Sequence, residues 1–193
     1  RDLGLGSADD AMEAVRAGSV ARVDLGTVGD RSFVNTLTFG GYGAVVDARE
    51  RLEGRIGKWP ALAVALAREL PRLEPLRVEI DGESTEVWLG WIGNCAYDPP
   101  GLAPAWRERL DDGLLDLRIL RAGPAARTRF LLAALTGKLS RLALYRQRLV
   151  ESVDLEFLDG PPRLAADGET FDGPASAKVA KRPGAVRIAV PPA

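Results

Sequence analysis

The sequence predicts a mainly β fold, an antiparallel β-sandwich or barrel-like domain with a few inserted helices. Apolar and polar residues alternate with a period of two over several short segments, as in strands with one buried face. Because strands and helices do not alternate along the chain, a doubly wound parallel sheet is disfavoured. Five Asp-Gly pairs, which favour tight hairpin turns, occur at Asp81, Asp112, Asp159, Asp167 and Asp172.

The first half of the chain is expected to form a helix, two strands and two further helices. Ser7 can cap the first helix and Gly18 can end it, with acidic residues in its first turn. Two stretches of period two follow as strands, and Pro60 stands near the start of the last helix. These elements are predicted at residues 7–18, 20–25, 31–37, 44–53 and 60–70.

The second half is expected to be richer in strands. Alternation on either side of Asp81-Gly82 predicts a hairpin, and prolines mark the stretch after it as loop-rich. Pro124 can open a helical segment, after which the alternation resumes. Strands are predicted at residues 76–80, 85–89, 114–121, 150–158, 163–166 and 186–190, a loop at 91–109, and the helical segment from 124 to about 148.

The composition fits one buried core and excludes several kinds of site. The chain has 193 residues, 46% of them hydrophobic, which suffices for one domain with an appendage. Without histidine, sites that need an imidazole are excluded and carboxylates must carry any proton transfer. The one cysteine, Cys95, cannot form an internal disulfide and fits a reducing cytosol. The 26 basic and 27 acidic residues nearly cancel, so nucleic acid is not an expected partner. The apolar stretches are too short to span a bilayer.

Paired acids in two Asp-Gly turns are candidates for general acid–base chemistry. Asp81-Gly82-Glu83 and Asp167-Gly168-Glu169 each place a second carboxylate two residues from the first, where it could orient or tune a base. An ordinary hairpin turn is the alternative at both places, and local sequence does not choose between them. Asp111 and Asp112, before a strand that carries Asp116, form an oxygen-rich turn that could hold Mg²⁺ or Ca²⁺, or be a simple turn.

Seven basic residues and no acidic residue occur between positions 121 and 148. Apolar residues are interleaved with them, which is the composition of a helix that rests on an anionic membrane surface. An ordinary pair of surface helices with one apolar side in the core explains the same pattern. The seven are Arg121, Arg127, Arg129, Lys138, Arg141, Arg146 and Arg148.

Six short motifs follow one another along the chain: Arg1–Leu5, Val23–Gly26, Phe33–Asn35 with Gly40-Gly41, Gly93-Asn94, Leu110–Leu117 and Leu164–Glu169. Their order resembles that of the bacterial soluble diacylglycerol kinases and their sphingosine kinase-like relatives. That family has a nucleotide-binding domain with a Gly-Gly-Asp-Gly-Thr motif and a second, β-sandwich domain, with the active site between them.

The resemblance implies a division of the chain and a function for it. Residues 1–18 would be a remnant helix of the nucleotide-binding domain, which is otherwise missing, and residues 19–193 the β-sandwich domain that handles the lipid substrate. The full-length protein would transfer phosphate from ATP to a lipid hydroxyl, that of diacylglycerol or a related lipid alcohol. ATP would be held mainly by the missing domain, so the isolated chain is expected to be inactive.

The resemblance also implies roles for five residues. Asp167 matches the general base toward the lipid hydroxyl, with Glu169 as its companion in the same motif. Asp81 then belongs to an ordinary hairpin. The Mg²⁺ site of the family matches the carboxylate of Asp112, with backbone oxygens from Arg109 and Leu114.

The expected partners are a lipid alcohol and an anionic membrane surface, which would be reached through residues 121–148. A homodimer is a further option. The expected location is cytoplasmic and peripherally membrane-associated. Two other functions fit the same residues: a non-catalytic lipid-binding or membrane-docking β domain, in which the carboxylates only form turns, and a structural or oligomerisation domain.

Overall fold

Antiparallel strands make up most of the part of this protein that the structure describes. The computed structural model describes residues 5–41, 74–100, 106–123 and 144–190, together with Leu3 and six single residues between 51 and 68. The mainly β, antiparallel fold predicted from the sequence is confirmed. The elements are α1 (Ala8–Ala17), β1 (Val20–Val28), β2 (Arg31–Phe33), β3 (Thr36–Gly40), β4 (Leu76–Ile80), β5 (Glu83–Asn94), β6 (Leu115–Arg121), β7 (Tyr145–Val150), β8 (Ser152–Phe157), β9 (Arg163–Ala166), β10 (Glu169–Asp172) and β11 (Ser176–Ala189).

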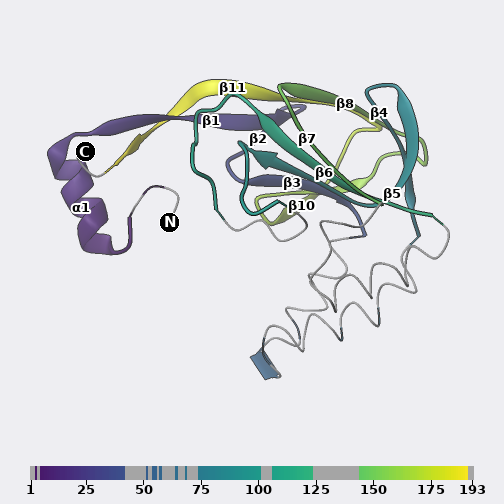
Figure 1. Ribbon diagram of the computed structural model, residues 1–193, viewed down its shortest axis with the longest axis horizontal. Coiled ribbons are helices and arrows are strands. Elements are labelled where there is room, and N and C mark those ends of the chain that lie inside the picture. The colour runs from purple at the N-terminus through teal and green to yellow at the C-terminus, as the bar shows by residue number, and fades with distance from the viewer. Residues whose placement is uncertain are drawn as a thin grey trace.

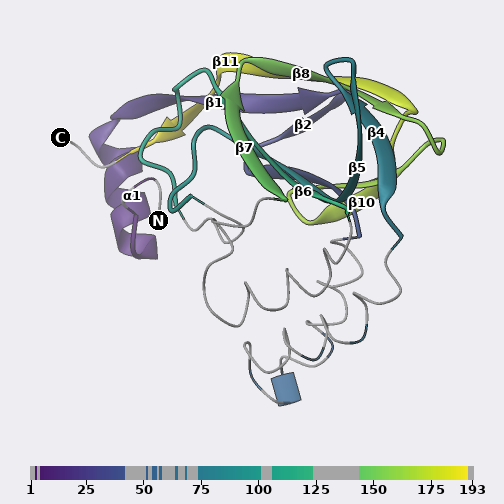
Figure 2. The ribbon, with the colours of Figure 1, turned by 45° about the vertical axis from the view of Figure 1, so that its right-hand side comes forward.

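The strands form one sheet that curls into a half-barrel (Figures 1 and 2). Its order is β10-β9-β3-β5-β4-β8-β11-β1-β2, and β6 and β7 continue it from the other edge of β5. β5 is the central strand because its first half pairs with β4, its second half pairs with β3, and β6 runs along it from Val87 to Asn94. β5 therefore joins the β4 side of the sheet, at its first half, to the β3 side, at its second half.

The apolar core lies inside the curl. Phe39 of β3 and Phe157 of β8 meet there edge to face, with ring centroids 5.5 Å apart. Gly90 of β5 leaves the space that the Phe39 ring fills, because a Cβ at position 90 would lie 2.0 Å from the ring. The buried residues around them include Val28, Phe33, Leu37, Val78, Val87, Ile92, Leu115, Leu117, Val153, Leu155, Leu164 and Val179.

The predicted first helix is confirmed as α1, which lies beyond one end of the sheet beside the start of β1 and the end of β11 (Figure 1). Ser7 and Asp10 form a reciprocal capping box, and Gly18 ends the helix with a left-handed φ of 71°. The assignment of residues 1–18 to a preceding domain stays a prediction. Among the described residues, no helix is both long and apolar enough to cross a membrane.

Several predicted boundaries were wrong because strand pairing extends or divides the local pattern. β5 continues through residues 91–94, which were predicted as loop, because they pair with both β3 and β6. The strand predicted at 31–37 is divided into β2 and β3 by a bend at Val34 and Asn35. β11 begins at Ser176, ten residues before the strand predicted at 186–190.

The predicted helical segment also ends too late. Residues 145–148 belong to β7, where pairing with β6 outweighs their helical pattern. Residues 124–143 of that segment lie outside the described residues, as do most of those in the helices predicted at 44–53 and 60–70.

Candidate functional site

Asp167 lies in the turn between β9 and β10, and its carboxylate binds the bend between β2 and β3. Its φ of 50° and the φ of 92° at Gly168 are the left-handed conformations of an Asp-Gly hairpin turn. Oδ1 accepts hydrogen bonds from the N–H groups of Asn35 at 2.7 Å and Thr36 at 2.9 Å, and Oδ2 accepts one from Val34 at 2.7 Å. Asp167 thus holds three consecutive backbone N–H groups while it remains exposed to solvent.

The two predicted acids share one hairpin but form no hydrogen bond with each other. Glu169 is the first residue of β10, where it pairs with Ala166, and its exposed side chain has no hydrogen bond or ion pair with any residue in the described part of the chain. A carboxylate offers about four lone-pair positions. Because Oδ2 of Asp167 accepts a single N–H, it can still accept a hydrogen bond from a substrate hydroxyl.

Arg107 and Asn94 hold the same bend through its carbonyl and side-chain groups. Arg107 is buried and donates to the carbonyl oxygens of Val34 at 2.8 Å and Asn94 at 3.1 Å, and to the side-chain oxygen of Asn35 at 3.1 Å. The Asn94 amide donates to the carbonyl oxygens of Val34 at 2.9 Å and Asp24 at 2.7 Å. The bend at residues 34–36, to which Asp167 is hydrogen-bonded, is therefore fixed by residues far apart in sequence.

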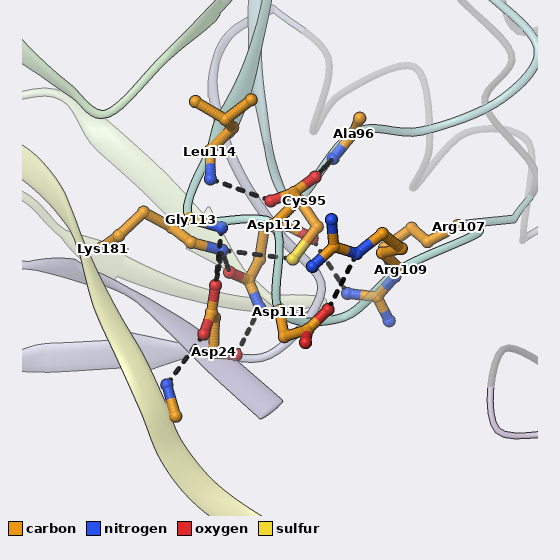
Figure 3. Close-up of polar contacts among 12 residues, drawn as sticks. Asp24, Cys95, Ala96, Arg107, Arg109, Asp111, Asp112, Gly113, Leu114 and Lys181 are labelled. Carbon is orange, nitrogen blue, oxygen red and sulfur yellow. Dashed lines mark hydrogen bonds and ion pairs between the residues drawn. The ribbon is translucent and has the colours of Figure 1, made fainter. Parts of the chain in front are cut away.

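Lys181 places a buried positive charge beside Asn94. Its ammonium lies 2.5 Å from the side-chain oxygen of Asn94, 3.2 Å from Sγ of Cys95 and 3.3 Å from Oδ2 of Asp24. Figure 3 shows Lys181, Asp24 and Cys95 converging from three different strands and loops. The side chains of Lys181 and Asp24 are 4% and 2% exposed, so this is an ion pair removed from water.

The surroundings of Asp24 and Cys95 set opposite protonation states. Burial alone would raise the pKa of Asp24, but the N–H groups of Gly184 at 2.8 Å and Gly113 at 2.9 Å, together with Lys181, lower it overall. Asp24 is therefore an ionised carboxylate. Burial raises the pKa of the Cys95 thiol despite the nearby ammonium, so Cys95 stays protonated at neutral pH.

The three predicted magnesium ligands lie on the loop that precedes β6. Each oxygen of Asp112 accepts one backbone hydrogen bond, from Ala96 and from Leu114, both at 2.8 Å. The Leu114 carbonyl accepts the N–H of Cys95 at 2.9 Å. Arg109 is exposed, and its guanidinium binds Asp111 at 3.1 Å (Figure 3).

These oxygens are suitable donors for a hard cation. The Asp112 carboxylate and the Leu114 carbonyl each keep unused lone pairs, and oxygen donors of this kind suit Mg²⁺. A second group, formed by Asp24, Cys95 and Asp112, brings one ligand atom from each residue within 4.8 Å of the others. The Lys181 ammonium already contacts two members of this second group, so it supplies the positive charge there.

One continuous polar network joins the predicted base to the predicted magnesium loop. It passes from Asp167 through the bend at 34–36 to Arg107 and Asn94, then through Lys181 and Asp24 to Gly113, which follows Asp112. Five of the six motifs that carry the family resemblance contribute a residue to this network, namely those that contain Asp24, Val34, Asn94, Gly113 and Asp167. The roles of Asp167, Glu169, Asp112, Arg109 and Leu114 in chemistry stay predictions.

Sequence reasoning assigned no role to four residues of this network, Asp24, Asn94, Arg107 and Lys181. Asp24 and Asn94 carried a signal, because each stands in a motif of the resemblance, and Asp24 is also a polar residue between apolar ones in a predicted strand. Arg107 and Lys181 carried none, because a single basic residue in a loop or near a strand reads as a surface residue.

Comparison with known proteins agrees with this architecture. A family profile described as "YegS C-terminal NAD kinase beta sandwich-like domain" matches residues 38–190. A curated protein of Enterobacter sp. (strain 638), named "Probable lipid kinase YegS-like", is 33% identical over 121 residues, which cover 58% of this chain and 40% of that protein. A crystal structure of a diacylglycerol kinase from Bacillus anthracis str. Sterne superposes with a TM-score of 0.65 at 20% identity, over 100% of this chain and 64% of that one.

The chain thus spans less than two thirds of the length of these relatives. The structural match at 20% identity supports the fold, and the profile match covers most of the chain. The resemblance noted from the sequence is confirmed: this chain belongs to the YegS C-terminal NAD kinase beta sandwich-like domain family, whose relatives include proteins named as lipid kinases.

Proposed function

We propose that this chain is the substrate-handling half of an ATP-dependent lipid kinase that phosphorylates the hydroxyl of diacylglycerol or a related lipid alcohol. The single observation that carries the proposal is the network that ties Asp167 to the Asp112 loop within a domain of this family. In such a kinase the base and the metal must act on the same phosphoryl transfer, so a rigid connection between their loops is what the chemistry requires.

Asp167 would act as the general base. Its carboxylate is fixed by three N–H groups, is exposed, and retains acceptor capacity on Oδ2. It would accept the proton of the lipid hydroxyl as the oxygen attacks the terminal phosphorus of ATP and ADP leaves. Glu169, whose side chain has no partner among the described residues, would complement it from the same hairpin.

Mg²⁺ would be held by the Asp112 carboxylate and by backbone oxygens of Arg109 and Leu114. When bound, it would neutralise charge on the triphosphate. The residues that bind the rest of ATP are proposed to lie in a nucleotide-binding domain outside this chain. The protein would work in the cytoplasm, peripherally attached to the membrane that contains its substrate.

The test is a kinase assay on this chain joined to a nucleotide-binding domain from the same family. Phosphate transfer to diacylglycerol in mixed micelles is measured for the unmodified fusion, Asp167→Asn, Glu169→Gln and Asn35→Ala. Asn35→Ala weakens the bend at Arg107 without removing the carboxylate, so it controls for distortion. Loss of a general base lowers kcat by about 10²–10⁴-fold.

We expect a loss of that size for Asp167→Asn and a loss below about tenfold for Asn35→Ala. Equal activity of Asp167→Asn and the unmodified fusion would remove Asp167 from the role of base. A non-catalytic lipid-binding domain is the second candidate, favoured by a cavity that is lined by Arg121, Arg146 and Arg148. It predicts lipid binding by the chain and no phosphate transfer by any fusion.

A further inference from the structure

A cavity of about 180 Å³ lies between the β4–β5 hairpin, β6 and β7. Its floor is apolar and consists of Ile80, Leu117 and Ile119, of which the first two are 5% and 1% exposed. Three arginines surround the floor, namely Arg121 at the end of β6 and Arg146 and Arg148 on β7. The cavity therefore combines an apolar bottom with a cationic wall.

Two of these arginines are held in place by neighbours. Arg121 donates from Nε to the hydroxyl of Thr85 at 3.0 Å, and Arg148 pairs with Asp81 at 2.5 Å. A guanidinium has five N–H donors, so each keeps donors for a ligand. Arg146 pairs with Ile119 through the backbone of β7, but its exposed side chain forms no hydrogen bond or ion pair with another described residue. Of the three arginines, only Arg148 is paired with an acidic residue in the described part of the chain, so Arg121 and Arg146 leave net positive charge on the wall.

The cavity is separate from the Asp167 network. None of its lining residues belongs to that network, although Leu117 pairs with Ile92, two residues before Asn94. A ligand in the cavity would therefore contact none of the residues that hold Asp167.

We infer that this cavity binds an anionic phospholipid, with the phosphate on Arg146 and its neighbours and the start of an acyl chain on Ile119 and Leu117. Bidentate N–H donors match phosphate oxygens, which favours an anion on the arginine wall. The apolar floor favours a ligand with hydrocarbon next to that anion, so a lipid fits better than a free phosphate. Glu83, on the rim, opposes anion binding.

The inference is independent of the proposed kinase reaction, because it concerns binding by this chain without ATP or another domain. The test is sedimentation of the 193-residue chain with vesicles of phosphatidylcholine, with and without phosphatidylglycerol. The variants are Arg146→Gln, Glu83→Gln and, as a control of equal charge change, Arg187→Gln. Arg187 is exposed on β11, away from the cavity lining.

We expect binding only to vesicles that contain phosphatidylglycerol, weakened by salt. Arg146→Gln should lower the affinity about fivefold and Glu83→Gln should raise it by a similar factor, since one charge near an anionic surface changes binding by about that much. Arg187→Gln should change it less than twofold. No binding to anionic vesicles, or equal losses in Arg146→Gln and Arg187→Gln, would overturn the inference.

A second measurement separates a lipid from a simple anion. Calorimetric titration compares dihexanoyl phosphatidylglycerol, which dissolves as a monomer, with inorganic phosphate. Tighter binding of the short-chain lipid, lost in Ile119→Asn, supports the assigned occupant because it requires the apolar floor. Equal affinity for the two ligands would reduce the cavity to a phosphate site and overturn the assignment to a phospholipid.

Discussion

Replacing Asp167 by asparagine should destabilise the domain as well as remove a candidate base. Hydrogen bonds to a charged group contribute about 1.5–3 kcal/mol each, and neutral ones about 0.5–1.5 kcal/mol. With its oxygen toward Asn35 and Thr36, an asparagine would keep two bonds as weaker neutral ones, and its NH₂ would oppose the N–H of Val34. The weakening of two hydrogen bonds and the loss of the third would together lower the free energy of unfolding by about 4 kcal/mol in a site without access to water. Because Asp167 is exposed and water can replace the lost contacts, we expect about half, roughly 2 kcal/mol.

The assay is urea unfolding followed by tryptophan fluorescence, with Glu169→Gln as the matched control. The side chain of Glu169 is exposed on the same hairpin without a partner among the described residues, so its variant should stay within about 0.5 kcal/mol of the unmodified chain. For a domain of this size, a loss of roughly 2 kcal/mol lowers Tm by about 4–8 °C. Equal stability of the two variants would mean that the Asp167 carboxylate does not hold the bend, and the argument from those three contacts would fail.

Three further results are expected from the buried cluster around Lys181. Lys181→Met should lower the free energy of unfolding in urea by about 3–5 kcal/mol, because it leaves Asp24 buried without its cation. The control Lys178→Met, at an exposed position on the same strand, should change it little. Similar losses in both variants would contradict a buried ion pair. The single thiol, Cys95, is buried and its pKa is raised, so it should react with a disulfide reagent at pH 8 only as fast as the protein unfolds. Rapid reaction of the thiol in the native protein would refute this. The pKa of Asp24 is lower in the native state than in the unfolded state. Its charge therefore stabilises the fold fully above the unfolded-state pKa of about 3.9, and this stabilisation is lost as the pH falls through the lower native pKa. Asp24→Asn should flatten the pH dependence of the free energy of unfolding below about pH 4. An unchanged acid profile in Asp24→Asn would argue against that shift.

The mainly β character of this protein was determined by local sequence. A hairpin such as β4–β5 needs only alternating residues on both sides of Asp81-Gly82, and α1 needs only Ser7, Asp10 and Gly18. These signals act within a few residues of one another, so they can be recognised without knowing the fold. The ordered motifs likewise indicate the family from the sequence alone.

Other boundaries depended on pairing between distant segments. Residues 145–148 carry a helical pattern, yet they form β7 because β6 offers an unpaired edge. Residues 91–94 remain in strand for the same reason, between β3 and β6. Pairing of this kind involves partners tens of residues away, and no local window contains that information.

The sequence by itself determined which residue types could act here: carboxylates in Asp-Gly turns, no imidazole, and basic residues concentrated between positions 121 and 148. Only the tertiary structure decided which of them meet. It joined Asp167 to the bend at 34–36, placed Lys181 against Asp24, and brought Arg121, Arg146 and Arg148 around one cavity. The physical reason is that hydrogen bonds, ion pairs and burial act between neighbours in space, and the curl of the sheet sets those neighbours.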